Sequence, residues 1–148
     1  SRLLEMGIDP FNFADSLLGV LAQRLARTLC QECRESYHPA KEEYDALAYG
    51  FGEEAFAGLQ ISYDDNFVLY RGKGCPSCRN TGYKGRIGLH ELLLISDAIK
   101  KLIHTRATAT ELFKVARAQE MTTLVQDSVL KVLQGRTDYA QVKAAATR

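Results

Sequence analysis

The sequence lacks several features, and each absence argues against a class of protein. No apolar run approaches the roughly 20 residues of a membrane-spanning helix, and the first residues lack the basic-then-apolar order of a signal peptide. Neither sign of charge is in excess, since 19 Lys and Arg residues stand against 18 Asp and Glu residues. No overall field therefore draws the chain toward nucleic acid or an acidic membrane. With 46% hydrophobic residues in 148, we expect a globular, cytoplasmic protein.

Motifs for catalysis are also scarce. The phosphate-loop pattern GxxxxGK[ST] is missing, because Arg71-Gly-Lys-Gly has neither the leading glycine at the required spacing nor a Ser or Thr after the lysine. Glu91, which follows Gly88 and His90, is the one candidate for an acid or base. A strand-edge carboxylate paired with a neighbouring Arg explains it more simply. We therefore predict no catalytic and no nucleotide-binding residue in this chain.

The four cysteines form two CxxC pairs and leave none over. The pairs are Cys30-Gln-Glu-Cys33 and Cys75-Pro-Ser-Cys78, with 41 residues between them. Four thiolates from two tight turns match the tetrahedral geometry of structural zinc. The separation exceeds the 15–20 residues of a simple zinc ribbon, which predicts a small substructure held between the two turns. The formal charge of about −2 on such a site also suits the basic residues near the pairs, which are Arg34, Arg71, Lys73, Arg79, Lys84 and Arg86.

Other uses of these cysteines fit less well. Two disulfides, or a thioredoxin-like redox pair, would need an oxidising compartment or a βαβ setting, and the sequence indicates neither. His38 lies five residues after Cys33 and is an alternative ligand, but four thiols already complete the set, so we expect a packing or surface role. His90 lies within an expected strand and His104 at the end of an expected helix, so neither is expected to bind a metal. A site with four thiolates leaves no open position for water, so the zinc is expected to be structural.

Hydrophobic spacing and capping residues predict an α+β fold that is mainly helical. The segment 14–29 has apolar residues at helical spacing, and Pro39 precedes a helix over 40–48 with one or two further turns over 53–59. Strands are expected at 67–70 and 86–95, paired as a hairpin with the metal at its tip. A bundle of four short helices then follows, opened by Ser96, by Thr108 or Thr110, and by Thr137, with Gly135 ending the third, at 97–104, 111–119, 123–134 and 138–146.

Several motifs together resemble one family over nearly the whole chain. They are Met6-Gly7 with Pro10-Phe11, Leu18-Gly-Val-Leu-Ala-Gln-Arg-Leu-Ala-Arg, Leu29-Cys-Gln-Glu-Cys, Cys75-Pro-Ser-Cys78, Thr81-Gly-Tyr-Lys-Gly-Arg-Ile-Gly-Leu-His-Glu and Gly135-Arg-Thr. In this order they resemble the C-terminal part of the bacterial type II secretion and type IV pilus assembly ATPases.

The resemblance implies that the motor activity belongs to a longer parent chain. In this family the phosphate loop, the Walker B motif and the acidic and histidine boxes lie upstream, in a RecA-like core that uses ATP and Mg²⁺. The parent is a homo-hexamer whose ATP hydrolysis drives pilus or pseudopilus assembly and protein export. The abrupt start at Ser1, without an initiator Met, agrees with a fragment. We expect such a fragment to be inactive as an enzyme by itself.

The resemblance also implies a division of the chain. Residues 1–29 would be the end of the ATPase core, 30–85 the tetracysteine zinc module, and 86–148 a last core strand with a helical extension. The family's module binds zinc, through the positions of Cys30, Cys33, Cys75 and Cys78, and is thought to contact the inner-membrane platform protein. The parent would thus be cytoplasmic and peripherally associated with the inner membrane.

A different reading is a free-standing zinc ribbon that binds nucleic acid. Basic residues near the CxxC pairs would then meet phosphates, and the candidates are Arg71, Lys73, Arg79, Lys84 and Arg86. The balanced charge and the missing aromatic residues between these positions argue against it. We therefore expect no nucleic-acid partner.

Overall fold

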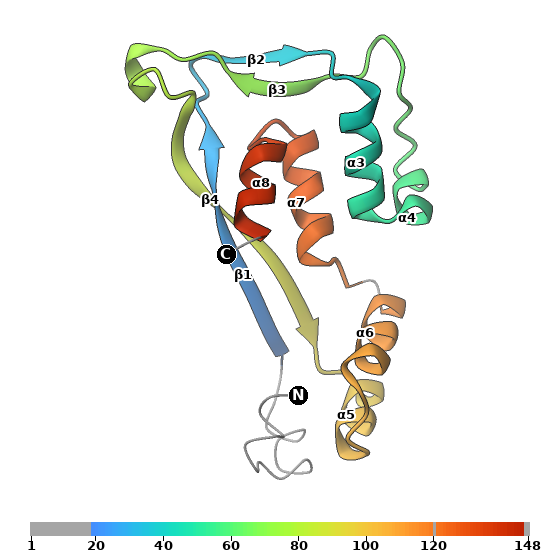
Figure 1. Cartoon of the computed structure of the whole chain (residues 1–148). Helices are drawn as coiled ribbons and strands as arrows, with labels where there is room; N and C mark the ends of the chain where they lie inside the picture. The colour runs from blue at the N-terminus through green and yellow to red at the C-terminus, as the bar shows by residue number, and fades with distance from the viewer. Residues whose placement is uncertain (1–18, 120, 147–148) are drawn as a thin grey trace. The chain divides into compact units, whose positions relative to one another are not determined.

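The computed structural model describes residues 19–119 and 121–146 (Figure 1). Among them, residues 19–22, 91–119 and 121–123 belong to a first compact unit, and 23–90 and 124–146 belong to a second. The expected α+β, mainly helical class is confirmed, and the described strands form two two-stranded sheets. None of the helices in the described part has the length and apolar composition that crossing a bilayer requires.

The segment expected to be a long amphipathic helix is a strand. Strand β1, Gly19–Leu29, pairs with strand β4, Tyr83–Leu94, so the helix predicted over 14–29 is wrong from residue 19 onward, and residues 14–18 lie outside the described part. The Leu, Ala, Gln and Arg residues of this segment favour helices in isolation. Pairing with a distant strand supplies the backbone hydrogen bonds instead, and tertiary context overrides local preference.

Both predicted strands exist, but they do not pair with each other. Strand β3, Leu69–Gly72, pairs antiparallel with strand β2, Arg34–Tyr37, so that Arg34 stands opposite Gly72 and Tyr37 opposite Leu69. The hairpin predicted between 67–70 and 86–95 is therefore wrong. Strand β2 begins directly after the first CxxC pair and β3 ends just before the second, so their pairing brings the two cysteine turns together (Figure 1).

The chain between β2 and β3 contributes to one apolar core cluster of the second unit. Helices α3, Lys41–Phe51, and α4, Glu53–Ala57, confirm the helical predictions for this region. The two helices are separated at Gly52, which has a φ of 100°. Glycine adopts this backbone conformation without strain, whereas residues with a side chain rarely do. Helices α3 and α4 and strand β3 pack against α7 through a buried apolar cluster made of Leu47, Phe51, Phe56, Phe67, Leu69, Val129 and Val132.

The four C-terminal helices are confirmed, as two pairs in separate units. In the first unit, Ser96 caps helix α5, Asp97–His104, by accepting from Ile99 N–H, and Thr108 caps helix α6, Ala109–Ala118, in a capping box with Glu111. These two helices bury Ile99, Ile103 and Ala116 together. Helices α7, Leu124–Leu133, and α8, Tyr139–Ala146, belong to the second unit.

Hydrogen bonds to residues distant in the sequence hold the turn before α8. Thr137, predicted to open this helix, is fully buried, and its hydroxyl donates to the Arg27 carbonyl at 2.7 Å. Asp138 caps α8 in its place, because its carboxylate accepts from Gln141 N–H at 2.9 Å. The same carboxylate also accepts a hydrogen bond from the Tyr83 hydroxyl at the start of β4. Asp138 thus ties helix α8 to the strand that leaves the second cysteine turn.

The Tyr83–Asp138 hydrogen bond predicts a pH-dependent contribution to stability. Burial, followed by the hydrogen bond and charge of Asp138, raises the pKa of Tyr83 to about 12. A raised phenol pKa means that the folded state holds the proton more tightly, so the contribution is complete below the unfolded pKa of about 10 and is lost as the pH rises toward the folded pKa. We expect Tyr83→Phe to lower the free energy of unfolding by about 1–2 kcal/mol at neutral pH.

Urea unfolding at neutral pH and above pH 10 measures this effect. The matched control is Tyr49→Phe, since the Tyr49 side chain is 80% exposed, and it should leave the midpoint unchanged. Equal midpoints for Tyr83→Phe and the unsubstituted chain at neutral pH would contradict the assigned hydrogen bond.

Candidate metal centre

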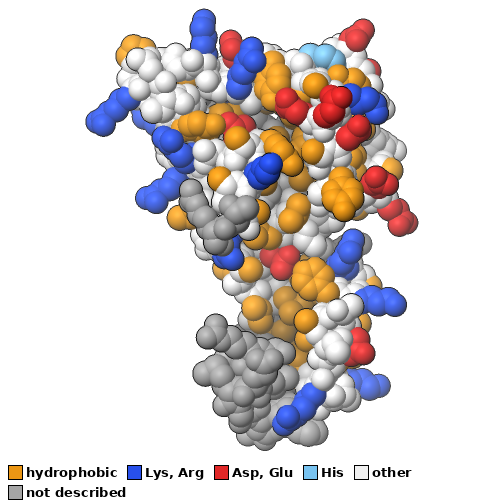
Figure 2. All heavy atoms as spheres, in the orientation of Figure 1, with side chains coloured by type: hydrophobic (Ala, Val, Ile, Leu, Met, Phe, Trp, Pro, Cys, Tyr) orange, Lys and Arg blue, Asp and Glu red, His pale blue; other side chains and the backbone are white. Residues whose placement is uncertain are grey.

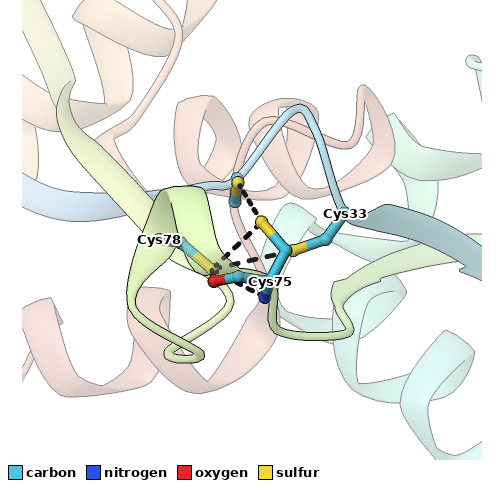
Figure 3. A group of neighbouring side chains, drawn as sticks. Cys33, Cys75 and Cys78 are labelled. Carbon is cyan, nitrogen blue, oxygen red and sulfur yellow. Dashed lines mark hydrogen bonds between the residues drawn. The ribbon is translucent and has the colours of Figure 1, made fainter.

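Each cysteine pair sits between two strands. Cys30 directly follows β1, and Cys33 directly precedes β2. Cys75 lies shortly after β3 and precedes the short 3₁₀ helix η1, Pro76–Cys78, from which the chain turns into β4. Figure 3 shows the side chains of Cys33, Cys75 and Cys78 pointing toward one another. The fold therefore gathers in one place the four thiols that the sequence predicts to act together.

The distances between the sulfur atoms fit a tetrahedral metal site. The Sγ atoms of Cys30 and Cys75 are 3.8 Å apart, those of Cys33 and Cys78 are 3.8 Å apart, and those of Cys75 and Cys78 are 3.7 Å apart. Zn–S bonds of about 2.3 Å at tetrahedral angles place sulfurs about 3.8 Å apart, whereas a disulfide bond is about 2.05 Å long. All four cysteines are free thiols within 4.8 Å of one another. The four cysteines can thus hold a metal ion.

Backbone N–H groups point at two of the sulfurs. Gly74 N–H donates to Cys33 Sγ at 3.2 Å, and Cys78 Sγ accepts from Cys75 N–H at 3.3 Å and from Gly82 N–H at 3.2 Å. Such donors stabilise thiolates and orient them toward a metal. The role of Gly74 and Gly82 as donors to the sulfurs was not predicted from the sequence. Their positions in the sequence could have indicated this role, because Gly74 lies one residue before Cys75 and Gly82 lies four residues after Cys78.

A close approach of two backbone segments explains why glycine stands at position 82. A Cβ atom built on Gly82, whose φ is 82°, would lie 2.7 Å from the Gly72 carbonyl oxygen. A side chain here would push β3 away from the turn that follows the second cysteine pair. The Gly82 carbonyl also accepts from Cys30 N–H at 2.9 Å. Gly82 therefore links both cysteine turns through its backbone.

The surroundings set the thiol pKa values in opposite directions. Burial raises the pKa of the Cys33 thiol despite the Gly74 N–H donor. At Cys78, burial also acts to raise the pKa, but the N–H groups of Cys75 and Gly82 and the neighbouring thiols outweigh it and lower the pKa below its ordinary value. A metal bound by all four sulfurs requires four thiolates, so binding would release protons.

Part of the basic charge near the cysteines is engaged in specific contacts. The Arg34 guanidinium lies 4.7 Å from the centre of the Tyr70 ring and donates to the Gly135 carbonyl at 2.8 Å. Arg71 pairs with Glu35 at 3.1 Å, and Lys84 donates to the Ser77 hydroxyl inside the second CxxC turn at 2.8 Å. These contacts give the predicted basic residues a structural role, and they add no support to the nucleic-acid reading.

The other candidate residues lie apart from the sulfur cluster. His38 has its Nδ1 atom 2.8 Å from the Phe67 carbonyl oxygen, and its ring centre is 5.1 Å from that of Tyr63, so it packs within the module. His90 lies in β4, where its backbone N–H donates to Asp127, and Glu91 follows it in the strand. Among the described residues, the four cysteines are the only group of three or more His, Cys, Asp or Glu side chains close enough to share a metal.

Similarity to known proteins agrees with the motifs. A family model described as "Type II/IV secretion system protein" matches residues 1–144. The type IV pilus assembly ATPase PilB of Thermus thermophilus is 41% identical over 97% of this chain, which corresponds to 15% of that protein. The type II secretion system ATPase E of Vibrio cholerae is 42% identical over 96% of the chain and 26% of its own length, and protein E of Pectobacterium carotovorum is 39% identical over 96% and 26%. The chain thus belongs to the type II/IV secretion system protein family and spans only about a sixth to a quarter of these relatives.

Proposed function

We propose that this chain is the zinc-stabilised C-terminal part of an ATPase that drives type II secretion or type IV pilus assembly. The observation that carries the proposal is the sulfur cluster, whose edges of 3.7 and 3.8 Å suit a tetrahedral zinc ion. The relatives support the parent activity, since two of them at 41% and 42% identity are named as pilus assembly and secretion ATPases. In this proposal Cys30, Cys33, Cys75 and Cys78 hold the zinc.

The proposed role of the metal is mechanical. In the second unit, Leu29 N–H at the end of β1 donates to the Arg136 carbonyl at 3.0 Å, and Lys73 N–H after β3 donates to the Cys33 carbonyl at 3.2 Å. A metal shared by the two cysteine turns would fix these strand ends together and close the 41-residue segment between them. Closing a long loop removes conformational entropy from the unfolded chain, so metal binding contributes directly to folding.

The ATP chemistry belongs to the parent chain in this proposal. ATP and Mg²⁺ would bind in an upstream RecA-like core of a hexamer, and residues 1–29 would be the end of that core. The module at 30–85 and the extension at 86–148 would pass nucleotide-driven movement to the inner-membrane platform protein from the cytoplasmic side. The support is the family membership and the lack of a phosphate loop in these 148 residues.

Metal analysis tests the site directly. Purified chain that has never met a chelator should contain one zinc ion per molecule, because four thiolates at this spacing leave no ligand unused. Elemental analysis by mass spectrometry measures the ratio. Protein without metal, or protein that carries a metal other than zinc, would show the zinc assignment to be wrong.

Removing one sulfur tests whether the metal stabilises the fold. We expect Cys75→Ser to lower the free energy of unfolding by several kcal/mol, because structural zinc contributes roughly 10 kcal/mol or more in zinc-finger peptides. Thermal unfolding with and without added zinc measures the change. Ser77→Ala, between the same two cysteines, is the matched control and should shift the melting temperature far less. An unchanged melting temperature for Cys75→Ser would show that the metal does not stabilise the fold.

Separating ATP binding from export tests the function. The 148-residue chain alone should hydrolyse no ATP above background, whereas the parent protein should hydrolyse it. In the parent, Cys75→Ser should leave the Kd for ATP within about twofold while pilus assembly or export is lost. Turnover by the isolated chain, or normal assembly by the zinc-free variant, would argue against a non-catalytic, force-transmitting role.

A further inference from the structure

The second unit carries an apolar groove that the zinc site does not explain. The groove encloses about 220 Å³ and is lined by residues of α3, α7 and α8 together with one residue each from β1 and β4. Its floor includes Leu89, Val129 and Ala145, which are at most 3% exposed. Hydrophobic side chains gather over α3, α7 and α8 in Figure 2. The floor is thus part of the folded core, and the groove is a feature of the packed unit.

Large apolar side chains surround the groove and remain exposed. Tyr49 is 80% exposed, Val125 is 45% exposed and Tyr139 is 37% exposed, and all three line the groove. A single exposed apolar residue on a surface is ordinary, whereas several around one concavity mark an interaction surface. Tyrosine is also enriched where proteins bind one another, since its ring is apolar and its hydroxyl tolerates water.

The polar groups at the groove indicate what it would bind. The Ser128 hydroxyl donates a hydrogen bond to the Leu124 carbonyl of its own helix at 2.7 Å, so its proton is already engaged within α7. The charged lining residues are Arg24 and Lys143, and no carboxylate lines the groove among the described residues. Asp45 on α3 lies outside the lining and pairs with Lys41. The groove therefore offers an apolar floor with positive charge beside it.

The volume distinguishes between kinds of ligand. Pockets for drug-sized molecules and cofactors usually enclose about 300–1,000 Å³, and this groove is smaller, at about 220 Å³. That space suits one or two apolar side chains of a protein segment. Such anchors, inserted into a preformed concavity, supply much of the energy of peptide recognition.

We propose that this groove binds a segment of a partner protein that inserts a bulky apolar side chain between α3, α7 and α8 and places a carboxylate near Arg24 and Lys143. The apolar anchor provides the affinity, and the exposed charges fix the orientation of the segment and contribute modestly. This inference goes beyond the proposed function, because none of the residues in the groove belongs to the sulfur cluster.

Selection from a library of random 12-residue peptides tests this assignment. Peptides that bind the 148-residue chain should share an aromatic or branched apolar residue with Asp or Glu within about four positions, because Arg24 and Lys143 line the same groove. The synthetic consensus peptide is then measured by fluorescence polarisation. Val125→Glu, at the exposed rim, should weaken binding at least tenfold, since it places a charge where the apolar anchor enters.

Charge reversal separates the electrostatic part. The double variant Arg24→Glu with Lys143→Glu should weaken binding about threefold to tenfold, as two exposed charge pairs allow, and replacing the acidic residue of the peptide by Lys should restore it. Lys114→Glu, on α6 in the first unit, is the matched control and should change nothing. The zinc content of every variant is measured, so that loss of the metal site is distinguishable from loss of the groove.

Three results would overturn the proposal. One is a selection that yields no consensus or a basic one. The second is unchanged affinity in Val125→Glu. The third is a parent protein that fails to bind the consensus peptide although the 148-residue chain binds it, since the groove would then be filled by another segment of the same chain.

Discussion

The approach of four sulfur atoms to within 4.8 Å of one another is the constraint on which the second unit depends. Two tight turns, far apart in the sequence, must meet with their thiols facing inward. Strand β2 leaves the first turn, and strand β3 enters the second, so the pairing of Arg34 with Gly72 begins at the cluster. The end of β1 and the start of β4 are placed by the same turns. A metal held there would thus act on all four strand ends at once.

Hydrogen bonds extend this constraint to the turn between α7 and α8. The side chain of Arg34, the residue after Cys33, donates a hydrogen bond to the Gly135 carbonyl. The backbone N–H of Leu29 donates to the carbonyl of the next residue, Arg136. Thr137 and Asp138 continue the same turn by bonding to Arg27 and Tyr83. Helix α8 is therefore positioned by residues beside the cysteines as well as by its packing against α7.

The second unit has two features with different chemistry. The sulfur cluster is polar, is supported by N–H donors and faces inward, whereas the groove is apolar and bordered by Tyr49, Val125 and Tyr139. One would hold the unit together, and the other would meet a partner. They have no residue in common. Damage to one can therefore be told from damage to the other.

Local chemistry in the sequence determined the CxxC turns, the Ser96 and Thr108 caps and most of the helices, because these depend on residues a few positions apart. Tertiary structure alone decided the pairing of β1 with β4 and of β2 with β3. The Leu and Ala spacing of 19–29 matches a helix, and only a partner strand more than 50 residues away makes it extended. Likewise Thr137 and Asp138 are both good caps by type, and burial of the Thr137 hydroxyl against Arg27 leaves the role to Asp138.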